Sequence, residues 1–226
     1  MTLTVNSYRE EMINAIKGKH SQMHPFTERW VKGELSRADL GFWAAQHYHY
    51  VGKFSRWLGA VMSECEYEDV RDFLLENMWE EEMGTRHTEM LIKFAEACGV
   101  TRDQVINANV LPTTLALSTW CYQKSKGPFL LAAAGLLVGL ESQVPAIYKR
   151  NTPPLREKYG FTADEVEFFT VHITADEDHA ERGFQILELY TKTDEERQMV
   201  LKTIQEATQM RWLYMTGINE ATLGMR

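Results

Sequence analysis

Cysteine is scarce in this sequence of 226 residues, and its three copies lie far apart. Cys65, Cys98 and Cys121 form an odd set without regular spacing, which argues against a disulfide framework. Free thiols are typical of a reducing compartment. The first residues, MTLTVNSYREEMINAI, also lack the basic and then apolar order of a secretory signal. A cytoplasmic location is therefore expected.

An excess of positive charge and long apolar runs are also missing. The formal net charge is −8, which argues against nucleic acid or an anionic membrane surface as a partner. The most apolar run, from Phe129 to Leu140, is too short to span a bilayer, and Glu141 follows it directly. These absences favour a soluble protein that binds neither nucleic acid nor a membrane.

Alternating strand patterns, internal repeats and low-complexity segments are missing as well. Apolar residues recur instead at the spacing of helices. With boundaries good to about three residues, helices are predicted at 5–18, 25–32, 37–65, 67–98, 102–108, 112–125, 128–150, 162–190 and 193–217. The linkers are short, which favours one compact all-α bundle over residues 1–226 rather than two domains.

Local signals predict where these helices begin and end. Capping boxes, in which a hydroxyl and a later acidic or amide side chain satisfy each other's backbone amides, mark helix starts. They occur at Thr101–Gln104, Thr162–Glu165 and Thr193–Glu196, with a weaker version at Ser36–Asp39. Helix ends are expected at Gly33, Gly99 and Gly160, and turns at Pro112, Pro128 and Pro153–Pro154. The last residues, 220–226, are expected to be frayed.

Three polar residues share one face of the predicted helix 162–190. Each helical residue advances by about 100°, so Asp176 lies about 40° and His179 about 20° from His172. Two imidazoles and a carboxylate on one face are good ligands for iron, manganese or zinc. The alternative is a solvated face on which charged residues pair at a spacing of four.

Glu141 lies on an apolar face of the predicted helix 128–150, together with Leu137, Val138 and Tyr148. A lone ionised carboxylate in such a place is costly unless it is paired or bound to a metal. The alternative to a metal is an arginine supplied by another helix.

Glu80 and His87 lie two turns apart on one predicted helix and so share nearly one face. Along a continuous axis they would be about 10 Å apart, which is long for two ligands of one ion. Gly84 between them permits a kink or a close approach. Glu81 and Glu82 are rivals for Glu80, and a surface acidic patch is the alternative to a metal site.

Three helices would together supply three carboxylates and three histidines. The predicted metal ligands are Glu80, His87, Glu141, His172, Asp176 and His179. Such a set offsets three of the four positive charges of two divalent ions and is typical of di-iron and di-manganese sites in helical bundles. The Glu-x-x-His repeat of ferritin-like proteins is absent, because no histidine follows any of these glutamates by three residues.

The predicted helix 37–65 has an aromatic face that most simply packs in the core. His47 and Tyr50 differ from their neighbours on this face because each has a polar tip that needs a partner when buried. These two residues are predicted to contact the substrate or to hydrogen-bond a metal ligand.

The order and spacing of the predicted ligands resemble those of a known family. Glu80-x6-His87, then Glu141, then His172-x3-Asp176-x2-His179 is similar to the ligand set of the haem-oxygenase-like di-metal oxidases. The resemblance is strongest to their CADD/PqqC-like branch, close to the TenA fold. It extends over most of the chain, through HPF at His24–Phe26, KGELSRADL at Lys32–Leu40, GLESQVP at Gly139–Pro145 and HITADEDHA at His172–Ala180.

This resemblance implies a haem-oxygenase-like helical bundle and a homodimer. It implies two divalent metal ions as cofactors, with iron first and manganese as the alternative. It further implies an oxidase or oxygenase that uses O₂ and a small organic substrate, namely an amino acid, a fatty acid or a cofactor precursor.

The sequence departs from two parts of this resemblance. The branch that forms p-aminobenzoate carries a tyrosine after its His-x-Phe segment, where this chain has Thr27, which argues against that reaction. TenA hydrolases use a cysteine nucleophile, and here Cys121 precedes the helix that carries Glu141 but has no matching acid beside it in the sequence. The alternative function is a metal-free PqqC-like oxidase or a TenA-like hydrolase in cofactor biosynthesis.

Overall fold

Helices form every regular element of the computed structural model, which describes residues 5–224. The elements are α1 (Val5–Lys17), η1 (Ser21–Met23), α2 (Pro25–Lys32), α3 (Arg37–Val51), α4 (Phe54–Glu64), α5 (Glu68–Glu82), α6 (His87–Ala97), α7 (Arg102–Ile106), α8 (Pro112–Ser125), α9 (Phe129–Ala133), η2 (Ala134–Leu140), η3 (Glu141–Gln143), α10 (Val144–Glu157), α11 (Glu167–Tyr190) and α12 (Asp194–Gly224). The predicted all-α fold class is confirmed.

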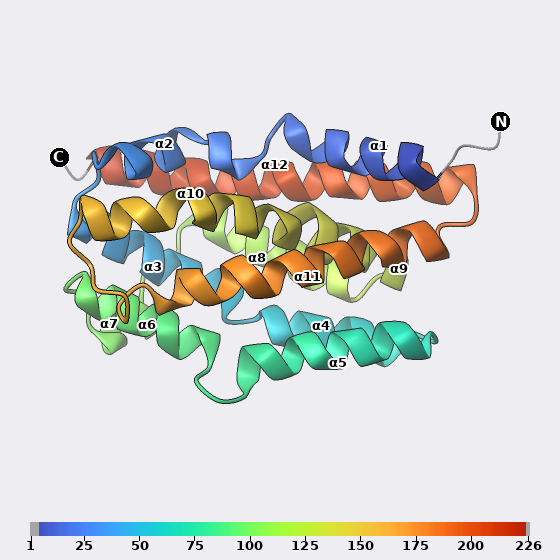
Figure 1. The fold of residues 1–226 in the computed structure, drawn as a ribbon, viewed down its shortest axis with the longest axis horizontal. Coiled ribbons are helices and arrows are strands. Elements are labelled where there is room, and N and C mark those ends of the chain that lie inside the picture. Colours follow the sequence, from blue (N-terminus) through green and yellow to red (C-terminus); the bar gives the residue numbers. More distant parts are fainter. Residues whose placement is uncertain (1–4, 225–226) are drawn as a thin grey trace.

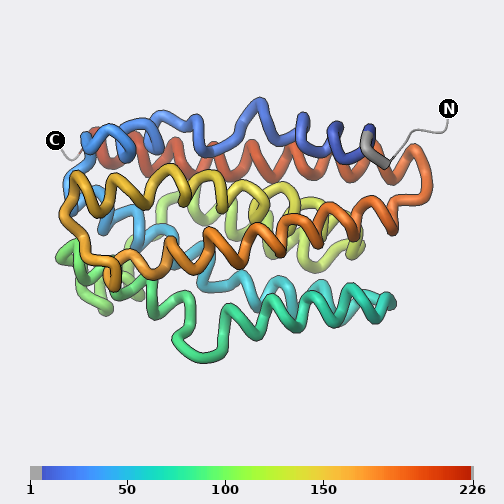
Figure 2. Tube along the Cα trace, viewed as in Figure 1, coloured from blue at the N-terminus to red at the C-terminus, as the bar shows by residue number. Residues whose placement is uncertain are grey.

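The helices lie in layers along one long axis (Figure 1). Helix α12 runs the length of the bundle beside α1 and α2, and α10 packs next to α11. Helix α11 lies between this upper part and the α4–α5 pair at the opposite edge (Figure 2). Because α11 contacts α5, α6, η2 and η3, residues on one of its faces can meet side chains from several helices.

The predicted capping boxes form. Ser36 accepts a hydrogen bond from the Asp39 amide at 3.0 Å, and the Asp39 carboxylate accepts one from the Ser36 amide at 2.7 Å. The same reciprocal bonds occur at Thr101–Gln104 and Thr193–Glu196. The Thr162–Glu165 box also forms, but it encloses a turn, and α11 begins later than predicted, at Glu167.

Two helices predicted as continuous are broken. The prediction of 37–65 is wrong at Gly52 and Lys53, which separate α3 from α4. The prediction of 67–98 is wrong at residues 83–86, where the chain dips away from the bundle between α5 and α6 (Figure 1). Gly84 there has a φ of 69°, which favours glycine over residues with a side chain. Periodicity missed the first break because the aromatic face continues across it from Tyr50 to Phe54 and Trp57.

The helix predicted at 128–150 extends from Phe129 to Glu157 and includes a π-helical stretch, η2. Pro153 and Pro154, predicted to make a turn, lie instead inside α10, near its C-terminal end. By length and composition this long helix could cross a membrane, but 83% of its most apolar segment is buried inside the bundle. Such burial is typical of a core helix.

The chain's C-terminal helix is longer than expected. Helix α12 continues to Gly224, so the prediction of fraying is wrong for residues 220–224. Residues 225 and 226 lie outside the described part of the chain.

Aromatic rings anchor α11 to the rest of the core. Phe169 stacks on Trp43 with ring centroids 5.7 Å apart and meets Phe94 edge-on at 4.9 Å. Trp43 in turn contacts Trp30 at 4.9 Å. This cluster lies one turn before His172, so it fixes the part of α11 that carries the polar face.

Candidate metal centre

Helix α11 holds three polar side chains in the interior. His172 is 8% exposed, Asp176 3% and His179 6%, whereas Glu177 and Asp178 are exposed. The prediction that the three share one inward face is therefore confirmed, and the alternative of a solvated face is wrong. Three titratable groups buried on one helix require partners from elsewhere in the bundle.

Glu141 reaches this face from the end of the π-helical stretch. A π-turn shifts the register of the backbone hydrogen bonds. Two side chains donate to backbone carbonyls here, Ser142 to Val138 and Gln143 to Gly139, both at 2.5 Å. Gly139 permits the close approach to α12, because a Cβ there would lie 2.4 Å from Ala207. Glu141 is thereby held 5% exposed and directed at α11.

The break between α5 and α6 brings a glutamate and His87 together. Nδ1 of His87, the first residue of α6, lies 3.0 Å from Oε2 of Glu81, near the end of α5. Because the helix is broken here, His87 and the glutamates of α5 are not separated by two turns of one continuous helix. In this structure Glu81, one of the two rivals of Glu80, is the glutamate next to His87.

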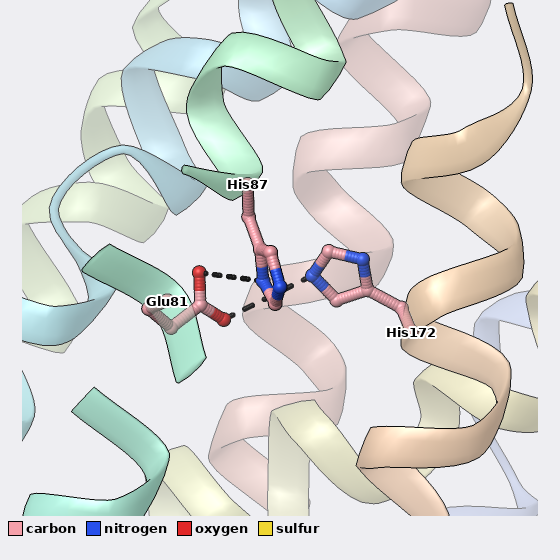
Figure 3. A group of neighbouring side chains, drawn as sticks. All are labelled: Glu81, His87 and His172. Carbon is pink, nitrogen blue, oxygen red and sulfur yellow. Dashed lines mark ion pairs between the residues drawn. The ribbon is translucent and has the colours of Figure 1, made fainter. Parts of the chain in front are cut away.

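Glu81, His87 and His172 form the first ligand group (Figure 3). Their donor atoms all lie within 4.8 Å of one another. Nδ1 of His172 donates to the carbonyl of Phe168 at 2.6 Å, which leaves Nε2 directed at Glu81, 3.8 Å from its Oε1. Such a bond on the far nitrogen fixes the tautomer and the ring orientation of a metal-binding histidine.

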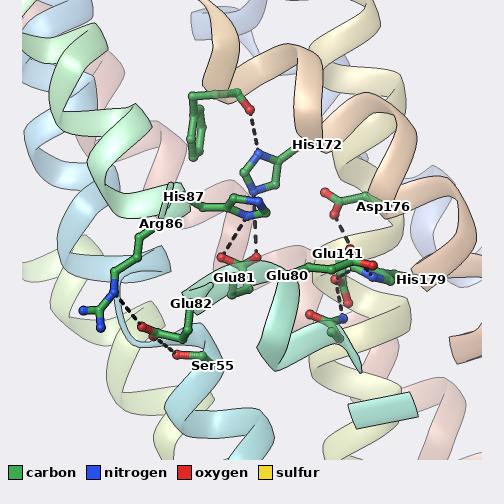
Figure 4. Close-up of polar contacts among 12 residues, drawn as sticks. Ser55, Glu80, Glu81, Glu82, Arg86, His87, Glu141, His172, Asp176 and His179 are labelled. Carbon is green, nitrogen blue, oxygen red and sulfur yellow. Dashed lines mark hydrogen bonds and ion pairs between the residues drawn. The ribbon is translucent and has the colours of Figure 1, made fainter. Parts of the chain in front are cut away.

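Glu141, Asp176 and His179 form the second ligand group (Figure 4), also with all donor atoms within 4.8 Å. Nδ1 of His179 lies 3.1 Å from Glu141 Oε1 and 3.6 Å from Asp176 Oδ1. The amide of Asn77 donates to Glu141 Oε1 at 3.0 Å. The other carboxylate oxygen, Glu141 Oε2, is buried and has no hydrogen-bond partner.

Glu80 lies beside the second group rather than the first. Its Oε2 is 3.2 Å from Nε2 of His179, the nitrogen that does not face Glu141 and Asp176. Its side chain is 40% exposed and lines a hollow of about 250 Å³ at the surface. Glu82 is separate from both groups and bonds Ser55 and Arg86. Metal ligation by Glu80 stays a prediction.

The ionisable side chains inside each group shift one another's pKa values. Burial alone lowers the pKa of His179, but the nearby Asp176 carboxylate and the hydrogen bond to Glu141 outweigh it and raise the pKa. Burial raises the pKa of Glu141, opposed by His179. In the first group burial disfavours both charged forms, but the closeness of Glu81 and His87 lowers the carboxyl pKa and raises the imidazole pKa.

The two groups fit divalent metal ions. Each combines carboxylate oxygen and imidazole nitrogen, which suits iron, manganese or zinc. The partnerless Oε2 of Glu141 supplies an observation specific to this structure, because a buried carboxylate oxygen without a donor is costly unless a cation is bound. Both groups also share α11, which would hold two ions side by side.

A cavity of about 40 Å³ adjoins both groups. It is lined by Glu81, Glu141, His172 and Asp176 together with His47, Tyr50, Val51, Phe54, Val144, Tyr148, Phe168 and Arg211. The structure thus brings His47 and Tyr50 to the predicted site. His47 is held between two hydroxyls, at 3.0 Å from Tyr214 and 3.1 Å from Tyr148, and burial lowers its pKa.

Three residues of the site escaped the sequence reasoning as functional groups. Asn77 was visible only as a polar residue on an apolar face. Tyr148 looked like core, and Arg211 on α12 had no neighbouring motif. Only the three-dimensional packing brings them to the ligand groups.

Comparisons with known proteins show the family of this chain. A family model described as an iron-containing redox enzyme matches residues 42–212. A 4-aminobenzoate synthase from Chlamydia trachomatis is 30% identical over 209 residues, covering 90% of this chain and 88% of that protein. A pyrroloquinoline-quinone synthase from Acinetobacter baumannii is 24% identical over 229 residues, covering 97% and 88%.

Solved structures confirm the fold. A TenA homologue from Pseudomonas syringae superimposes with a TM-score of 0.83 at 15% identity, over 96% of each chain. A CADD-like protein from Nostoc punctiforme has a TM-score of 0.77 at 15% identity, over 96% of this chain and 98% of that one. The chain therefore belongs to the iron-containing redox enzymes with the haem-oxygenase-like fold.

Proposed function

We propose that this protein is a non-haem oxidase or oxygenase that uses O₂ and two metal ions, iron first and manganese as the alternative. The observation that carries the proposal is the pair of ligand groups on α11, beside a cavity of about 40 Å³. Bound iron would supply the electrons and the open positions that O₂ chemistry requires.

The chain's own residues would bind, orient and shield. Phe168 and Asn77 fix the orientations of His172 and Glu141 through the hydrogen bonds at 2.6 and 3.0 Å. The apolar side chains of the cavity, among them Phe54 and Phe168, keep bulk water away from the ligands. The hydroxyls of Tyr148 and Tyr214, which contact His47, can hold a proton at the edge of the site.

The substrate would be a small organic molecule such as an amino acid, a fatty acid or a cofactor precursor. The relatives named 4-aminobenzoate synthase suggest a precursor, but Thr27 stands where that branch has a tyrosine. Thr27 is fully buried and donates to the Ser21 carbonyl at 2.8 Å. We therefore propose a different substrate. Growth of a 4-aminobenzoate auxotroph upon expression of this chain would contradict that part of the proposal.

The alternative of a TenA-like hydrolase has less support. Cys121 is fully buried, and burial raises the pKa of its thiol. Because the thiolate is the nucleophile, such a cysteine is poorly suited to attack a substrate. Cys121 is also absent from the lining of the cavity beside the ligand groups.

Oxygen uptake after metal loading tests the proposed function. The full chain is loaded with Fe(II) under anaerobic conditions, and O₂ consumption is followed with an electrode on exposure to air. We expect uptake that His172→Ala and His179→Ala both abolish. Uptake that is absent from the loaded protein, or unchanged in both variants, would contradict the proposal. The homodimer and the cytoplasmic location stay predictions.

A further inference from the structure

Arg211 is a buried cation on α12 for which residues 5–224 supply no acidic partner within ion-pair distance. It is 4% exposed. Its guanidinium donates to the Leu140 carbonyl at a long 3.3 Å, and its Nε has no hydrogen-bond partner. Arg197 on the same helix, by contrast, pairs with Glu11 at 2.8 Å. A buried charge is costly without an opposite charge, so the site of Arg211 is suited to an anion.

The position of Arg211 places that anion next to the ligand groups. Arg211 lines the same cavity as Glu141, Asp176 and His172. It also lies beside the hydroxyl of Tyr50, which lines the cavity too. The rest of the lining includes apolar side chains such as Phe54 and Val144. A molecule in this cavity would thus meet a cation, a hydroxyl and apolar surface together.

A second, smaller cavity of about 10 Å³ touches Arg211 from another side. Ser21 and Asn151 also line it, and Ser21 Oγ and Asn151 Oδ1 are buried without partners, like Arg211 Nε. The volume has room for about one water molecule, which would link these atoms. A water does not neutralise the guanidinium, so the need for an anion remains.

Metal binding would increase the need for an anion beside Arg211. The three carboxylates of the ligand groups offset three of the four charges of two divalent ions. With Glu80 counted as a fourth carboxylate, the charges are merely equal. In either case no carboxylate is left over for Arg211, so the loaded site favours an anionic molecule.

We infer that Arg211 binds the carboxylate group of a small substrate and holds its carbon chain beside the two ligand groups. This inference rests on the proposed function and names its substrate class. The 40 Å³ cavity has room for about three water-sized groups, which suits a carboxylate on a short carbon stem. Arginine is the side chain best shaped to hold a carboxylate through two hydrogen bonds.

A matched pair of probes tests the inference. Propionate and propionamide have nearly the same shape and differ by one charge. Each is titrated into the full chain loaded with zinc, which is redox-silent, in a buffer without carboxylates, and binding is followed by ligand-observed NMR. We expect propionate to bind about tenfold tighter or more, as for a charged hydrogen bond in a buried place.

Variants test whether Arg211 causes the preference for propionate over propionamide. Arg211→Gln should abolish the preference for propionate, and Arg211→Lys should keep part of it. Arg197→Gln, on the same helix but outside the cavity, should leave it unchanged. An equal affinity for both probes in the natural chain, or an undiminished preference in Arg211→Gln, would overturn the inference, the latter because the carboxylate would then bind the metal ions.

Two further measurements keep the outcomes apart. Metal content is measured for each protein: a chain without bound metal refutes the proposed function, whereas a loaded chain without the charge preference refutes only the role of Arg211. If Arg211→Gln does not fold, a crystal structure of the natural chain with propionate decides. A carboxylate within hydrogen-bond distance of the guanidinium supports the inference, and one bound elsewhere overturns it.

Discussion

The two ligand groups share α11 but differ in how their other members are supplied. In the second group Glu141, Asp176 and His179 are all buried and come from two long helices. Asn77 donates a hydrogen bond to Glu141. In the first group Glu81 and His87 come from the two ends of a four-residue break, and Glu81 is partly exposed. The second group is thus built on rigid elements, and the first depends on the conformation of a loop.

The groups differ in charge as well as in rigidity. The second has two carboxylates and one histidine, and the first has one carboxylate and two histidines. Both differences favour the second group for the first metal ion, because less ordering is needed there and the field is more negative. The two ions would therefore bind in a fixed order, with the second group filled first.

The largest expected effect is the loss of one ion. His179→Ala should remove the metal of the second group and His87→Ala that of the first, since each group would keep only two ligands. Metal content after gel filtration of anaerobically loaded protein should fall from two to about one per chain in each variant. His49→Ala, whose side chain donates to the Val105 carbonyl outside both groups, is the control. Two ions retained in both variants would contradict the assignment.

The neighbouring glutamates should give a graded effect. Glu81→Gln should weaken the metal of the first group by roughly 10–100-fold or more. Glu80→Gln should weaken the second group less, because Glu80 contacts His179 from the exposed side. Glu82→Gln is the matched control, since Glu82 bonds Ser55 and Arg86. Metal titrations measure all three, and a stronger effect of Glu80→Gln would restore Glu80 as the ligand.

Gly84→Ala should affect the first group alone. Its φ of 69° strains any residue with a side chain, at a cost of about 1–2 kcal/mol, and no atom lies near enough to clash with the added Cβ. Gly99→Ala is matched, because its φ is 89° and its surroundings are equally open. Urea denaturation should show similar losses of stability, while only Gly84→Ala should weaken the first metal. Equal metal binding in both would show that the break does not position Glu81.

The smallest expected effect is at Cys121. Burial and the raised pKa of its thiol predict no alkylation by iodoacetamide in the native protein near pH 8 and full oxygen uptake in Cys121→Ser. Mass spectrometry and the oxygen electrode measure these. A hydrolytic activity that Cys121→Ser abolishes and a chelator does not would favour the hydrolase instead.

The sequence predicted the parts of the site that depend on one helix. His172, Asp176 and His179 were found because a continuous helix fixes which residues share a face. Glu141 was found because a carboxylate on an apolar face needs a counterion. Both arguments use only local geometry and the cost of burying a charge.

The sequence could not predict the parts that depend on irregular backbone. The choice between Glu80 and Glu81 depends on how the chain turns at Gly84, which no periodicity reports. The π-helical stretch that directs Glu141 has no clear sequence signal. Arg211 becomes notable only when the packing shows that its guanidinium is buried and its Nε has no hydrogen-bond partner.

Anomalous X-ray diffraction at the iron absorption edge tests the central claim most directly. Crystals of the full chain are loaded with Fe(II) without oxygen. The account predicts two peaks about 3.5–4 Å apart, one among Glu81, His87 and His172 and the other among Glu141, Asp176 and His179. A single peak, or peaks away from these residues, would contradict it.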